Sequence, residues 1–195
     1  MSIESIQTQF NESVAAKLES VDTLAPAVCA AIDTMFSALV DNRKVLACGN
    51  GASAMLAQYF AAQLVNRYER DRPALAGLAL TSDGGVLTAI SNDYDFTQVF
   101  AKQVQAFGHA GDILLAISTS GDAANVVEAI HAAHEREMIV IALTGKGGGR
   151  MVEALSDTDV HIIVPHERAT RIHEVHLLTI HCLCDGIDTM LLGEN

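Results

Sequence analysis

Ile113-Leu114-Leu115-Ala116-Ile117-Ser118-Thr119-Ser120-Gly121 contains a buried strand and the turn that follows it. The first five residues are a continuous apolar run, which is typical of a strand covered on both faces in a parallel sheet. The segment from residue 122 to residue 130 has the apolar periodicity of a helix. The order of strand, turn and helix indicates an α/β domain.

The turn itself predicts a binding site for an anion. Ser118, Thr119 and Ser120 supply three successive hydroxyl groups immediately before a helix. The first turn of a helix has unpaired N–H groups and the positive end of the helix dipole, so it attracts phosphate. The alternative is an ordinary N-cap. Because a cap needs one hydroxyl rather than three, the pattern favours a phosphate site.

Four further apolar runs extend the pattern along the chain, at residues 44 to 48, 76 to 80, 138 to 143 and 159 to 164. Together with residues 113 to 117 they predict about five parallel strands in a three-layer, flavodoxin-like fold. The first run is followed by the turn Gly49-Asn50-Gly51-Ala52-Ser53. This turn and the Ser118 turn would flank one crevice, where open α/β sheets bind ligands.

Helices are predicted at both ends of the chain. Apolar residues at three- and four-residue steps predict a helix over residues 2 to 22, a second helix runs from residue 26 to residue 40, and a long one from residue 167 to residue 192. We expect one domain over residues 1–195, divided into a helical oligomerisation segment (1–41), an α/β core (42–166) and a C-terminal helix (167–195). The apolar stripe of the first helix would pack either on another subunit or on its own sheet.

Composition excludes some classes of partner. Twelve basic and 24 acidic residues give a net charge of −12, so direct binding to nucleic acid is not expected. No apolar run approaches the roughly 18 to 20 residues that span a bilayer, so no membrane segment is expected. The four cysteines form no C-x-x-C pair and are expected to be reduced, which favours a cytoplasmic protein. The negative charge still permits a phosphorylated small molecule as the ligand, because local N–H groups can outweigh it at close range.

The two turns, together with Ala142-Leu143-Thr144-Gly145 and Ala169-Thr170-Arg171-Ile172-His173-Glu174, give the chain a resemblance to the SIS (sugar isomerase) domain family. It resembles the phosphoheptose isomerase branch in particular, over nearly its whole length. The resemblance implies a cytoplasmic homotetramer, often with zinc, that isomerises sedoheptulose 7-phosphate. The same branch includes the DnaA initiator-associating proteins, which bind the replication initiator DnaA.

The resemblance also implies the residues that bind the phosphosugar. These are Asn50, Gly51, Ala52, Ser53, Asn92, Asp93, Ser118, Thr119, Ser120 and His173. Two positions depart from the pattern of the isomerases. Ala123 replaces a serine, which removes one phosphate hydroxyl, and Ala52 replaces a glycine.

The metal and proton-transfer positions depart further. The isomerases carry His and Glu four residues apart after the first turn, where this chain has Tyr59 and Gln63. On the last helix the corresponding positions are His173 and His181. A carboxylate can take a proton from a sugar carbon, whereas an amide cannot. Zinc prefers His, Cys and carboxylate ligands, so no cofactor is expected unless His173 and His181 form a rebuilt zinc site.

The sequence therefore favours a phosphosugar-binding protein that is not an enzyme, of the kind that associates with DnaA and regulates replication. The alternative hypothesis is an active phosphoheptose isomerase with an altered site, in which His181 is the catalytic base. A third and weaker hypothesis is a sensor domain that binds a sugar phosphate and regulates another protein.

Overall fold

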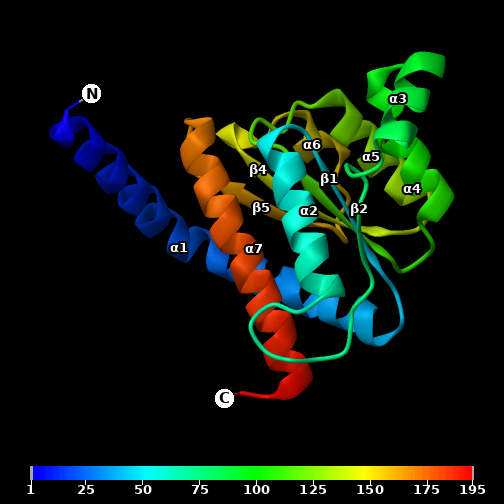
Figure 1. Cartoon of the computed structure of the whole chain (residues 1–195), viewed down its shortest axis with the longest axis horizontal. Helices are drawn as coiled ribbons and strands as arrows, with labels where there is room; N and C mark the ends of the chain where they lie inside the picture. The colour runs from blue at the N-terminus through cyan, green and yellow to red at the C-terminus, as the bar shows by residue number, and fades with distance from the viewer. Residues whose placement is uncertain (1, 195) are drawn as a thin grey trace.

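Five parallel strands form the central sheet in the order β2-β1-β3-β4-β5 (Figure 1). The computed structural model describes residues 2–194. The strands are β1 (Val45–Gly49), β2 (Gly77–Ala79), β3 (Ile113–Ile117), β4 (Ile139–Gly145) and β5 (Val160–Val164). Each of them overlaps one of the five apolar runs of the sequence, and β1 and β4 extend one and two residues beyond theirs. The order is that of flavodoxin, so the predicted fold is confirmed, and the topological switch point lies between β1 and β3.

Helices cover both faces of the sheet, which gives three layers. One face carries α1 (Ile3–Val40), α2 (Ala52–Val65) and α7 (Ala169–Leu192), whose apolar side chains pack on residues such as Ala47 and Leu115. The other face carries α4 (Ala101–Phe107), α5 (Ala124–Glu135) and α6 (Gly149–Ala154). The helix α3 (Gly84–Asp93) and the 3-10 turns η1 (Phe96–Gln98) and η2 (Lys146–Gly148) complete the fold.

The N-terminal segment is one helix of 38 residues, so the prediction of two separate helices is wrong. Pro26 lies inside α1, where its missing N–H removes one helical hydrogen bond. The helix continues because its C-terminal half is buried on the sheet, through side chains such as Leu24, Met35 and Leu39. Burial of these side chains offsets the cost of the proline.

The N-terminal half of α1 extends away from the rest of the domain (Figure 1). The six apolar residues predicted as a stripe are between 47% and 78% exposed: Ile3, Ile6, Phe10, Val14, Leu18 and Val21. The stripe was expected to pack either on another subunit or on its own sheet. In the structure it does not pack on its own sheet.

Two local elements have irregular structure. Residues 96 to 107 are divided into the 3-10 turn η1 and the helix α4. The glycine-rich turn after β4 forms η2 and leads directly into the short helix α6. Three glycines with positive φ, Gly147, Gly148 and Gly149, permit this path.

By length and composition alone, α1 and α7 are apolar enough to cross a membrane, with mean hydropathies of 1.6 and 1.3 over 18 residues. Charged residues interrupt the apolar runs of both helices, so neither run by itself predicts a membrane span. Core helices of ordinary domains meet the same criterion. Here α7 packs along the sheet and α1 packs on α7 and β5.

Buried polar contacts fix α7 to the rest of the core. Asp188 pairs with Arg72 of the α2–β2 loop at 2.5 Å, and both side chains are almost fully buried. About three turns earlier on the helix, His176 Nε2 lies 3.0 Å from the backbone carbonyl oxygen of Thr144 near the end of β4. Because a carbonyl oxygen only accepts, Nε2 is the protonated nitrogen of this imidazole.

The stability of the fold should depend on pH through His176. Burial lowers the pKa of His176 from 6.5 to about 4. Because the folded-state pKa lies below the unfolded value, the unfolded chain binds more protons on acidification, and the free energy of unfolding falls as the pH drops through 6.5 toward 4. Between pH 7 and pH 5, the titration of His176 alone should lower the free energy of unfolding by about 2 kcal/mol.

Urea unfolding at fixed protein concentration measures this effect, with His176→Gln as the comparison. Glutamine retains an N–H donor for the Thr144 carbonyl but does not titrate. Between pH 7 and pH 5 the free energy of unfolding should therefore fall by about 2 kcal/mol less in the variant than in the wild type. Equal losses in the two proteins would contradict the assignment.

Candidate phosphosugar site

The loop after β3 carries hydroxyl groups whose hydrogens are free to donate to a ligand. Ser118 Oγ accepts a hydrogen bond from the N–H of Gly121, and Ser120 Oγ accepts one from the N–H of Asp122, both at 3.2 Å. A hydroxyl oxygen that already accepts keeps its own hydrogen free to donate. The two serines are therefore oriented as donors at the approach to the N-terminus of α5. Such donors suit the oxygens of a phosphate group.

A close contact between backbones holds this loop in place. Gly121 has a φ of +70°, and a Cβ atom at this position would lie 1.8 Å from the carbonyl oxygen of Gly148. The Gly121 carbonyl accepts from the N–H of Met151 at 2.9 Å. Asp122 Oδ1 accepts from the N–H of Arg150 at 3.0 Å. The loop is thus attached to the start of α6, and only glycine fits at position 121.

A cleft of about 220 Å³ opens beside the loop. It lies at the carboxyl ends of β1 and β3, which is the switch point of the sheet. The residues that line it come from three separate parts of the chain: Asn50, Ser53, Ile117, Ser118, Thr119, Ser120, Ala123 and His173. The structure therefore brings together six of the predicted phosphosugar ligands.

Asn50 joins the two turns of the cleft. Its side chain exchanges two hydrogen bonds with the side chain of Asn125, at 2.7 and 2.8 Å. Asn125 lies in the first turn of α5 and was missed by the sequence analysis, since an asparagine in a helix has no signal of its own. The neighbouring Gly51 and Ala52 are exposed and do not line the cleft.

Asn92 and Asp93 lie apart from the cleft. They are exposed residues at the end of α3, and Asn92 Nδ2 donates to Asp93 Oδ1 at 2.9 Å. Neither lines the cleft of the single chain. Their assignment to the phosphosugar site stays a prediction that rests on the resemblance.

His173 forms the α7 wall of the cleft. Its Nε2 atom lies 3.3 Å from Ser53 Oγ, and its ring centroid is 6.5 Å from that of His176. Burial lowers the pKa of His173, so the imidazole is neutral at pH 7. A neutral imidazole can either donate a hydrogen bond to a sugar hydroxyl or accept one from it.

His181 lies eight residues further along α7 and contacts different partners. Its Nε2 atom is 3.3 Å from the hydroxyl oxygen of Tyr59 on α2. Its ring packs between two tyrosines, with centroid distances of 5.7 Å to Tyr59 and 6.0 Å to Tyr68. The two histidines predicted as a possible rebuilt site thus have different partners, since Tyr59 contacts His181 and Ser53 contacts His173.

The residues at the family's metal positions do not fit zinc. Tyr59, Gln63, His173 and His181 include two imidazoles but neither carboxylate nor thiolate, and tetrahedral zinc sites need three or four such ligands. Within residues 2–194 no three His, Cys, Asp or Glu side chains gather in a way that could hold a metal ion. No zinc-dependent step is derived from this donor set.

Comparisons with known proteins identify the family. The SIS domain family model matches residues 9–145. The chain is 60% identical to the phosphoheptose isomerase of Azoarcus sp. (strain BH72), over 98% of this chain and 97% of that protein. It is 50% identical to the phosphoheptose isomerase GmhA of Neisseria gonorrhoeae, whose structure matches with a TM-score of 0.91 over 95% of this chain and 98% of the other.

A third relative agrees with these two. The structure of a phosphoheptose isomerase from Francisella tularensis matches with a TM-score of 0.94 and 45% identity, over 97% of this chain and 99% of the other. These matches contradict the prediction of a non-enzymatic protein that associates with DnaA and acts in DNA replication, because the relatives of high identity are isomerases. The prediction that Tyr59 and Gln63 mark a loss of catalysis is therefore wrong. The chain belongs to the phosphoheptose isomerase family of SIS-domain proteins.

Proposed function

We propose that this protein is a phosphoheptose isomerase, which converts sedoheptulose 7-phosphate to D-glycero-D-manno-heptose 7-phosphate. The observation that carries the proposal is the 60% identity with an isomerase over nearly the full length of both chains. The geometry supports it, because a hydroxyl-rich loop and two α7 histidines lie along one side of the domain.

The loop after β3 would bind the phosphate of the substrate. Ser118 and Ser120 keep hydroxyl hydrogens free to donate, and the N-terminus of α5 adds its dipole. These local donors act at close range, where they outweigh the net charge of −12. His173 and Ser53 would contact hydroxyl groups further along the sugar chain. The proposal implies a cytoplasmic enzyme with neither a nucleic acid nor a membrane as its partner.

Turnover of the phosphosugar tests the function directly. The purified protein should convert sedoheptulose 7-phosphate to the aldose phosphate, observed by NMR of the sugar protons. The unphosphorylated ketose should react with a much lower kcat/KM, because it cannot use the hydroxyl-rich loop. A protein that converts neither sugar, with or without added zinc, would contradict the proposal.

Ser120→Ala should weaken substrate binding. A hydrogen bond to a charged group is worth about 1.5–3 kcal/mol, so KM for sedoheptulose 7-phosphate should rise about tenfold or more. The phosphate does not react, so kcat should change much less. Steady-state kinetics measure both constants. Thr34→Ala is the matched control, since the Thr34 hydroxyl donates to the Ala30 carbonyl on α1, away from the cleft, and its KM should equal that of the wild type.

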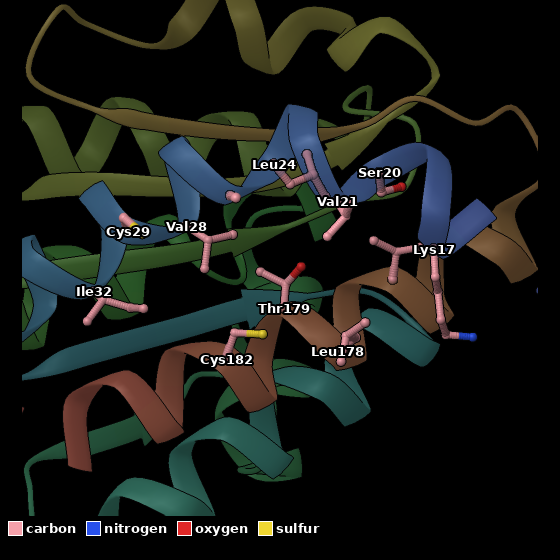
Figure 2. Close-up of a pocket in the computed structure, with 12 residues that line it drawn as sticks. Lys17, Ser20, Val21, Leu24, Val28, Cys29, Ile32, Leu178, Thr179 and Cys182 are labelled. Atoms are coloured by element: carbon pink, nitrogen blue, oxygen red, sulfur yellow. The ribbon is translucent and has the colours of Figure 1, made fainter. Parts of the chain in front are cut away.

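We infer that the protein assembles as a homotetramer. Two features of the single chain support this inference. One is the exposed stripe on α1 described above. The other is an apolar groove of about 300 Å³ between α1 and α7, lined by side chains such as Val21, Val28 and Leu178 (Figure 2). Contiguous exposed apolar surface of this kind marks sites of protein association.

Sedimentation velocity tests the assembly. The wild type should sediment as four chains at micromolar concentration. Phe10→Glu places a charge in the stripe, where Phe10 is 71% exposed, and should shift the protein to smaller species. Asn11→Glu adds the same charge at the neighbouring exposed position and should leave the tetramer intact. A wild type that sediments as a single chain would contradict the inference.

A further inference from the structure

We propose that Tyr59 and His181 form the proton-transfer pair of this isomerase, and that the pair works without a bound metal ion. The inference rests on the proposed function. It concerns which groups move protons, and it can fail while the isomerase assignment stands.

The contact between the two side chains is direct. The Tyr59 hydroxyl oxygen and His181 Nε2 lie 3.3 Å apart, although the residues are 122 positions apart in the sequence. Their rings meet edge to face, at an interplanar angle of 66°. The Tyr68 ring lies on His181 as well, tilted by 31°. Helices α2 and α7, which supply the pair, both pack on the same face of the sheet.

The pair lies on the helix that also borders the phosphate cleft. His173 is in the cleft wall, and His181 follows it by eight residues, which is a rise of about 12 Å along an α-helix. A seven-carbon sugar held by its phosphate at the Ser118 loop would extend past His173 along α7. Its carbonyl end would then approach Tyr59 and His181. This arrangement separates binding of the phosphate from the reaction at the other end.

The donor set at this end of the site favours organic acid–base groups over a metal. Gln63, one turn after Tyr59 on α2, is an amide that neither takes a proton nor binds zinc well. With Nε2 of His181 unprotonated, Tyr59 supplies a hydroxyl that can donate and His181 an imidazole that can accept. These are the two functions that an enediol mechanism requires.

The reaction balances with this pair alone. The His181 imidazole removes a proton from C1 of the ketose, and the electrons of that C–H bond form the C1=C2 double bond. The C2 carbonyl oxygen takes the hydroxyl proton of Tyr59, which gives an enediol. The Tyr59 phenolate then takes the proton of the C1 hydroxyl, so that C1 becomes the aldehyde carbonyl. The imidazolium returns its proton to C2, and both residues regain their starting states.

Tyr59→Phe tests the pair while it preserves the packing of the ring. Removal of a general acid typically costs a factor of about 10² to 10⁴, so kcat for sedoheptulose 7-phosphate should fall at least a hundredfold with little change in KM. Tyr68→Phe is the matched control. The Tyr68 ring also packs on His181, but among residues 2–194 no hydrogen bond joins its hydroxyl to that imidazole, so kcat should change far less. Equal losses in the two variants would overturn the proposal.

A double variant tests whether the two groups act together. His181→Ala alone should lose turnover, and adding Tyr59→Phe to it should cause little further loss, because residues of one catalytic unit are not additive. If the loss of kcat in the double variant equals the product of the losses in the two single variants, the pairing is overturned.

Metal content provides a readout besides activity. The purified wild type should contain no stoichiometric zinc by elemental analysis, and a chelator should change neither its melting temperature nor its kcat. Stoichiometric zinc, with turnover lost on chelation and restored by zinc, would overturn the metal-free pair and leave the isomerase function intact. A wild type without turnover in either state would defeat both proposals.

Discussion

The site depends on the contact between the backbones of Gly121 and Gly148. A side chain on either glycine would collide with a neighbour, since a Cβ atom at position 148 would also lie 2.3 Å from a methyl group of Val152. The contact lets the loop after β3 rest on the start of α6, so the hydroxyl groups of the loop are fixed before any ligand arrives. A preorganised set of donors loses little entropy on binding, which is the general advantage of rigid anion sites.

Helix α7 transmits that rigidity to the other end of the site. The helix is fixed at two points, by His176 on the Thr144 carbonyl and by the buried pair of Asp188 with Arg72. His173 and His181 lie on the same helix and keep a constant spacing along it. In the proposed reaction, the helix itself would therefore set the distance between the phosphate end and the reacting end of a bound sugar.

Much of the fold could be predicted from the sequence, because continuous apolar runs between turn residues identify parallel strands. The two turns of the cleft could be predicted as well, because each of them directly follows such an apolar run. The single α1 helix could not be predicted, since a proline such as Pro26 normally ends a helix. Here tertiary burial lets the helix continue. The contact of Tyr59 with His181 was also missed, because residues so far apart in the chain meet only after the sheet forms. The absence of a carboxylate at Gln63 therefore favours a protein without catalysis when the sequence is considered alone, and the identity with the isomerases contradicts that prediction.

The length of α1 has a consequence for a newly made chain. A single chain that has just folded carries a helix whose C-terminal half is covered by its own domain and whose N-terminal half exposes apolar side chains. In the proposed tetramer other chains would cover this exposed half, so the time for which it stays exposed after synthesis would depend on the local protein concentration. At low concentration, proteases and chaperones would then meet the exposed helix for longer.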